Sequence, residues 1–139
     1  MSAFDRQLLA EKAAAVERHL ARVEQQLPRA PEELHPATAA SDAVILHLWQ
    51  AVQIVIDLAL AACVRLKLGT PKDYGDAFQR LARAGHLAPE LAARLVKAAG
   101  FRNAVAHAYE GLDMSRTFAS AKSGPQDLRA FLVAMRALV

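Results

Sequence analysis

Four polar side chains lie close together along the chain near position 105, separated mostly by small apolar residues. They are Arg102, Asn103, His107 and Tyr109. A histidine can accept and return a proton near neutral pH, and the planar guanidinium of an arginine can hold a phosphate. RNA carries its own nucleophile, the 2′-hydroxyl. A general base and a phosphate clamp would therefore be enough to cleave RNA without a metal ion.

The helix expected to carry these residues divides them between two faces. Residues four apart lie on one face of an α-helix, so Asn103 and His107 share a face. Arg102 and Tyr109, seven apart, share another that is turned away from the first. Two resolutions are open. In the first, the helix frays near His107, as Gly111 favours, and Tyr109 turns toward the face of His107. In the second, a symmetry-related copy of the chain completes the site.

Five helical segments and no strand are predicted to position this motif. Prolines and glycines separate them, and their expected ranges are 3–27, 41–68, 73–84, 89–110 and 125–138. Ser41 is the expected N-cap of the second helix, with Asp42 at the positive end of its dipole and Gly69 at its C-terminus. A mobile loop is expected over 111–124. The whole chain, 1–139, is predicted to be one all-α domain, an antiparallel helical bundle.

Composition and charge exclude several classes of protein. Hydrophobic residues make up 54% of the chain and charged residues 22%, which excludes disorder. Cys63 is the only cysteine, so neither a disulfide framework nor a structural metal site is expected, and no cofactor is indicated. Asp57 interrupts the most apolar run, 43–64, so a membrane span is not expected and the setting is expected to be cytoplasmic. Residues 1–93 hold 10 basic and 11 acidic side chains, whereas residues 94–139 hold 7 basic and 3 acidic ones. A polyanion would therefore bind to the positively charged last third of the chain.

The motif resembles that of the HepT toxins, small helical ribonucleases of the HEPN superfamily. Their Arg-x4-His-x-Tyr pattern is matched by Arg102, His107 and Tyr109. Upstream, two blocks that also resemble the family in order and spacing are 49–59 and 71–85. The resemblance covers about 41–118, and outside this range the chain matches only as generic helices.

The resemblance implies a homodimer whose paired motifs line a cleft at the two-fold axis and cleave RNA without a metal ion. It also implies a partner, the nucleotidyltransferase antitoxin MntA, which transfers AMP from ATP onto the motif tyrosine. His107 would then be the general base or acid, Arg102 the phosphate clamp and Asn103 the orienting group. Tyr109 would be the AMP acceptor, and its adenylyl group would add bulk and negative charge where RNA phosphate must sit.

Other interpretations of the same residues stay open. The runner-up is a non-catalytic binding module, whose cleft docks the nucleotidyltransferase or a nucleotide. A third is a helical dimerisation domain, in which Tyr109 is buried and Arg102 is only an ion-pair partner of Glu110 or Asp113. Because a buried Tyr109 could not be modified, its exposure decides between these interpretations.

Two further polar side chains stand on the apolar second helix. Asp57 needs a partner there, and an ion pair with an arginine of the fourth helix is expected, with support of Arg102 as the alternative. His47 replaces an asparagine that is frequent in the family and is a possible second polar contributor to the site. The remaining histidines are expected at the surface, namely His19, His35 and His86.

Overall fold

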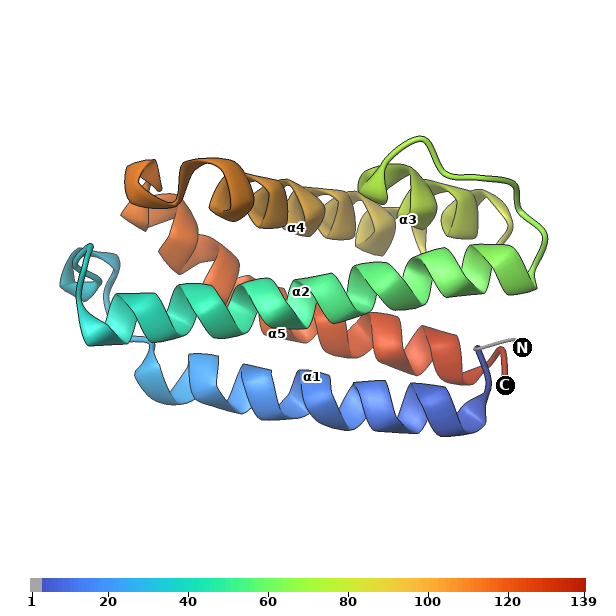
Figure 1. Ribbon diagram of the computed structural model, residues 1–139, viewed down its shortest axis with the longest axis horizontal. Helices are drawn as coiled ribbons and strands as arrows, with labels where there is room; N and C mark the ends of the chain where they lie inside the picture. The colour runs from blue at the N-terminus through green and yellow to red at the C-terminus, as the bar shows by residue number, and fades with distance from the viewer. Residues whose placement is uncertain (1–3) are drawn as a thin grey trace.

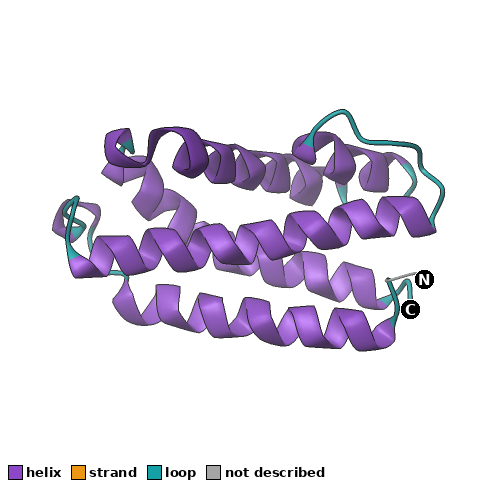
Figure 2. Cartoon of the chain, in the orientation of Figure 1, coloured by secondary structure: helices purple, strands orange, loops and turns teal. Residues whose placement is uncertain are grey.

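The computed structural model describes residues 4–139, and it confirms the all-α prediction: five α-helices, two short 3-10 turns and, within this range, no strand. Figure 2 shows that helices make up almost the whole fold, with loops only at their ends. In chain order the elements are α1 (Arg6–Gln26), η1 (Pro31–Glu33), α2 (Ala39–Arg65), α3 (Tyr74–Arg83), α4 (Pro89–Ala108), η2 (Tyr109–Gly111) and α5 (Met114–Arg136). The predicted start of the first helix, residue 3, lies outside the described residues.

The central helix of the bundle is α2, which packs against each of the other four helices. Figure 1 shows α1 along one side of α2 and α3 with α4 along the other, and α2 and α5 run opposite to α1 and α4. By length and composition alone α2 could also cross a membrane, but half of its most apolar stretch is buried inside this bundle (50%). A helix that is apolar on most sides is typical of such a central position.

The predicted ends of α2 are wrong by a few residues. Thr38, not Ser41, is the N-cap: its Oγ1 accepts a hydrogen bond from the Ser41 backbone N–H at 3.1 Å. The Ser41 hydroxyl in turn accepts from the Thr38 backbone N–H at 3.1 Å, so the two residues form a reciprocal capping box. At the other end the helix stops at Arg65, because Lys67 already adopts a positive φ of 57°.

The prediction of a mobile loop over 111–124 is also wrong, since α5 starts at Met114 rather than near Pro125. Asp113 caps this helix by accepting from the backbone N–H groups of Ser115 and Arg116 at 2.9 and 3.2 Å. Pro125 is buried within the helix. Other buried residues, Thr117, Phe118 and Ala121, attach the preceding turns to the bundle, so packing outweighs the hydrogen bond that proline removes.

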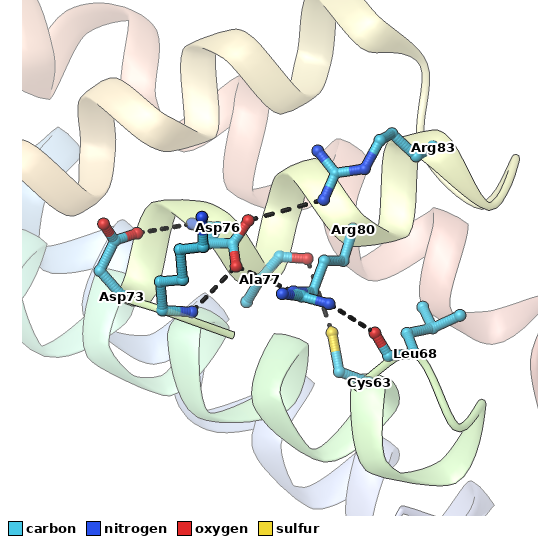
Figure 3. Close-up of polar contacts among 8 residues, drawn as sticks. Cys63, Leu68, Asp73, Asp76, Ala77, Arg80 and Arg83 are labelled. Carbon is cyan, nitrogen blue, oxygen red and sulfur yellow. Dashed lines mark hydrogen bonds and ion pairs between the residues drawn. The ribbon is translucent and has the colours of Figure 1, made fainter. Parts of the chain in front are cut away.

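A network of hydrogen bonds fixes the α2–α3 connection and thereby the start of α3 (Figure 3). Arg80 donates from Nη1 to the Leu68 carbonyl and from Nε to Asp76, both at 2.8 Å. Asp76 also accepts from the backbone N–H of Lys72 at 2.9 Å, and these two donors hold the pKa of its carboxyl below the usual value. The network matters for the site because Tyr74, the first residue of α3, contacts the motif.

We expect Gly69→Ala to lower the free energy of unfolding more than Gly85→Ala does. Both glycines have positive φ, 85° and 86°, a conformation that costs other residues about 1–2 kcal/mol. A Cβ at Gly69 would also lie 2.9 Å from Nη1 of Arg80, which its bond to Leu68 holds in place, whereas a Cβ at Gly85 meets nothing within 4 Å. Chemical denaturation measures both losses, and equal losses would contradict a structural role for the Arg80 contact.

Candidate active site

The motif lies on the C-terminal half of α4, which the rest of the bundle leaves largely uncovered. The buried residues of α4 all precede Gly100 and are Leu91, Ala92, Leu95 and Ala99. From Gly100 to Gly111, every residue is exposed or half-buried. Side chains on this half are therefore open to a substrate or a second protein chain.

The helix ends beside His107, as in the first of the two alternatives, in which the helix frays there. α4 is predicted to reach residue 110 but stops at Ala108, whose φ of −149° and ψ of 45° are not helical, and Tyr109 opens the turn η2. Tyr109 nevertheless stays on the side of α4 that faces α2: its hydroxyl donates to Oδ1 of Asp42 at 2.6 Å. The fraying therefore does not bring Tyr109 round to the face of His107.

Arg102 is fixed from three directions. Its Nε donates to Oε1 of Gln53 on α2 at 2.7 Å, and its Nη1 donates to Oδ1 of Asn103 at 3.2 Å. The guanidinium lies over the ring of Tyr74, 5.1 Å from the ring centre, in a cation–π contact. No residue among 4–139 accepts a hydrogen bond from Nη2, so this end of the guanidinium can hold a phosphate. An ion pair with Glu110 or Asp113 does not form.

Asp57 supports Arg102 indirectly, through Gln53. The expected ion pair between Asp57 and an arginine of the fourth helix is wrong: Oδ1 of Asp57 instead accepts from Nε2 of Gln53 at 3.0 Å. The amide orientation is forced, because arginine can only donate and a carboxylate can only accept. The amide therefore links the negative charge of Asp57 to the positive charge of Arg102.

Asn103 and His107 lie on the exposed face of the motif. Within the described part of the chain, the His107 ring has no hydrogen-bond partner, and the Asn103 side chain forms a hydrogen bond only with Arg102. An imidazole with both nitrogens unengaged can meet a substrate hydroxyl directly. One chain thus presents Arg102 and Tyr109 toward α2, with Asn103 and His107 facing outward.

Tyr109 is accessible, which removes the buried-tyrosine interpretation. The residue is 42% exposed although its hydroxyl is hydrogen-bonded to Asp42. The hydrogen bond to Asp42, together with partial burial and the negative charge of that carboxylate, raises the pKa of the Tyr109 hydroxyl to about 12. The phenol is therefore fully protonated at neutral pH.

His47 lies outside this site, contrary to the suggested supporting role. It faces α1, where its Nδ1 lies 3.0 Å from Nδ1 of His19. His19 is therefore half-buried and paired rather than a free surface residue. Burial comes first among the causes that lower the pKa of His19, followed by the charges of His47 and Arg18.

We expect this histidine pair to make the fold less stable in mild acid. Because the pKa of His19 is lower in the folded state than in the unfolded chain, its contribution to stability is complete above the ordinary value of about 6.5 and is lost as the pH falls below it. His47→Gln should therefore reduce the drop in melting temperature between about pH 7.5 and pH 5.5. His35→Gln, at an exposed position, is the control, and equal drops in both variants would exclude the pair as the cause.

Three residues that contact the motif were missed as site residues by sequence reasoning. From the sequence alone, Asp42 indicates only a favourable charge at a helix start, and Gln53 and Tyr74 belong only to the blocks that resemble the family. Asp42 and Gln53 are eleven residues apart, about three helical turns, so they occupy one stripe of α2. That spacing was a usable signal, but it did not show that α4 would pack along the stripe.

A groove of about 810 Å³ lies on another side of α4, between this helix and α5. Small and apolar residues line much of it, including Gly100, Phe101, Ala104, Ala108 and Leu112. Lys97 and Arg116 add positive charge to its lining. The groove adjoins the motif but contains none of its four polar residues.

Comparison with known proteins identifies the family. The family described as "Ribonuclease HepT-like" matches residues 14–135. Comparison with curated proteins gives no match. Among solved structures, a tri-AMPylated Shewanella oneidensis HEPN toxin in complex with MNT antitoxin is similar at 25% identity and a TM-score of 0.83, over 93% of this chain and 96% of that one.

Two further structures agree in fold. A mutant of the toxin–antitoxin MntA–HepT shares 25% identity and a TM-score of 0.83, over 95% of this chain and 99% of that one. A toxin–antitoxin with AMP-PNP has a TM-score of 0.86 at 23% identity, over 95% and 99% of the two chains, and supports the fold alone. Since the family match spans most of the sequence and the Arg-x4-His-x-Tyr motif is in place, this chain belongs to the HepT-like ribonuclease family.

Proposed function

We propose that this protein is the toxin of a toxin–antitoxin pair, an RNA endonuclease that needs no metal ion and acts in the cytoplasm. The observation that carries the proposal is Arg102, held by Gln53 and Tyr74 with one nitrogen unengaged, on the same helix as the exposed His107 five residues further along the chain. A fixed cation and an accessible base are what phosphodiester cleavage by the 2′-hydroxyl requires.

In the proposed reaction, His107 removes the proton of the 2′-hydroxyl while the 2′-oxygen attacks the neighbouring phosphorus. The bond from phosphorus to the 5′-oxygen breaks, a 2′,3′-cyclic phosphate remains, and the leaving 5′-oxygen takes a proton from water. Arg102 stabilises the negative charge that develops on the phosphate oxygens, and Asn103 helps to orient the phosphate.

We further propose that the active form is a homodimer with the site at the two-fold cleft. Within one chain the motif residues face two directions, so a second copy can supply the groups that one copy turns away. The uncovered half of α4 carries small exposed residues, Ala104, Ala106 and Ala108, which permit close approach of a second helix.

We propose that AMP transfer to Tyr109 by an MntA-like nucleotidyltransferase silences the enzyme. The 42% exposure of Tyr109 supports this, as does its position two residues from His107. The similar Shewanella toxin is described as tri-AMPylated and in complex with an antitoxin. A phosphate on Tyr109 would bring negative charge to the side of α4 that also carries Arg102, where it competes with RNA.

The test is cleavage of a defined RNA, in chelator, before and after incubation with the nucleotidyltransferase and ATP. We expect the unmodified protein to cleave and the modified protein to be inactive. Intact-mass measurement should show a gain of AMP on the wild type and none on Tyr109→Phe. Equal gain in both would place the acceptor elsewhere, and absence of cleavage by unmodified protein on several RNAs would favour the binding module.

A further inference from the structure

We propose that Asp42 is the catalytic base for AMP transfer to Tyr109: its carboxylate takes the phenol proton while the phenol oxygen attacks the nucleotide. The proposal rests on the proposed modification of Tyr109 and assigns to the toxin itself a part of the chemistry that silences it.

The geometry favours this role. The Tyr109 hydroxyl donates to Oδ1 of Asp42 at 2.6 Å, a short bond of the kind formed between a hydroxyl and a charged acceptor. No other side chain among residues 4–139 forms a hydrogen bond or ion pair with this carboxylate, so it is free to receive the proton. The proton points toward Asp42, which leaves the lone pairs of the phenol oxygen available for attack.

Asp42 lies on a long helix of the bundle, whereas Tyr109 lies in a short turn at the surface. Asp42 lies in the first turn of α2, the central helix, directly after the capping box formed by Thr38 and Ser41. Tyr109 stands in η2, and both side chains are exposed. A nucleotide held by a second protein can therefore approach the phenol while Asp42 keeps its position on the helix.

AMP transfer exchanges one bond at the α-phosphorus of ATP for another. A bond forms between the phenol oxygen and the α-phosphorus of ATP, and the bond from that phosphorus to the bridging oxygen of the β-phosphate breaks. Pyrophosphate leaves, Asp42 holds the phenol proton, and solvent then accepts it. No oxidant or reductant takes part, and ATP is the nucleotide that the proposed modification already uses.

Phenolate formed in advance cannot supply the nucleophile efficiently. With a pKa of about 12, only about one Tyr109 in ten thousand is ionised at pH 8. The same carboxylate that disfavours the phenolate is the group positioned to accept the proton during attack, when the phenol oxygen becomes more acidic.

The experiment compares the initial rate of AMP transfer to the wild type, Asp42→Asn and Glu90→Gln, with the MntA-like nucleotidyltransferase, magnesium and ATP. Asparagine keeps an acceptor oxygen for the phenol but cannot take its proton. Glu90 is an acidic residue in the first turn of α4, so its variant controls for loss of charge at a helix start. Circular dichroism checks that each variant is folded.

We expect Asp42→Asn to be modified about 100-fold more slowly than the wild type at pH 7, and Glu90→Gln at the wild-type rate. The rate of Asp42→Asn relative to wild type should rise as the pH is raised from 6 to 9, because the variant depends on phenolate; a purely structural role would leave that ratio constant. A wild-type rate in Asp42→Asn, or a constant low ratio, would overturn the role of Asp42 alone. No AMP gain by the wild type would overturn the modification itself, and Asp42 with it.

Discussion

His107→Ala is expected to slow RNA cleavage by a factor of about 10²–10⁴, the usual contribution of a general acid–base group. His107 is exposed, lies on the uncovered half of α4, and has both ring nitrogens unengaged within residues 4–139. Removing it deprives the 2′-hydroxyl of its proton acceptor but leaves Arg102 and its partners in place. The measurement is the initial rate of cleavage of a defined RNA in chelator, with unmodified protein.

The matched control is His35→Ala, because His35 is also exposed and its ring forms no hydrogen bond or ion pair with the described residues. This variant should cleave at the wild-type rate. If His107→Ala cleaves as fast as the wild type, the assignment of His107 as the base is wrong. If both variants lose activity together with helical content, the loss reflects folding, which circular dichroism distinguishes.

The motif and its helix could be predicted from local sequence, because both depend on short spacings. The four-residue step from Asn103 to His107 and the seven-residue step from Arg102 to Tyr109 assign each side chain to a face of α4. Fraying near His107 was one of the two arrangements left open, although the helix was predicted to reach residue 110 and ends at Ala108. These features depend on neighbours along the chain, which is the information that a single sequence carries.

The partners of the motif could not be predicted in the same way. Asp42 and Gln53 contact α4 only because α2 and α4 pack with a particular rotation and offset, which residues distant in sequence determine. The same holds for Asp57, for which a direct ion pair was expected and an amide intervenes. His47 was misassigned for this reason too, since its helix face turns toward α1 rather than α4.

Helix boundaries failed where tertiary packing outweighs a local signal. Pro125 is a strong local indication of a helix start, yet α5 continues through it because residues on both sides are buried. At the start of α2, Thr38 and Ser41 are both good capping residues, and the three-residue spacing between them makes the first the cap and the second its reciprocal partner.

Arg102→Lys is expected to lower the rate of RNA cleavage by about 100-fold, comparable to the loss of a fixed donor to a developing charge. Lysine keeps the positive charge but is a flexible point charge. It cannot bond Gln53 and Asn103 and still present a nitrogen to the phosphate. Cleavage rates measured at saturating RNA isolate the catalytic step, and near-wild-type activity would show that charge alone is sufficient.

Gln53→Ala separates the position of Arg102 from its charge, because it removes the acceptor of the 2.7 Å bond and leaves the guanidinium over Tyr74. We expect a smaller loss, about tenfold, since the cation remains but is held by fewer contacts. Asp57→Asn should lower the rate of RNA cleavage by a still smaller factor, because Asp57 acts on Arg102 only through the Gln53 amide. The order of these three losses tests the chain of contacts as a whole. If Gln53→Ala were as harmful as Arg102→Lys, the position in which Gln53 holds the cation, rather than the number of donors on the guanidinium, would account for the loss in Arg102→Lys.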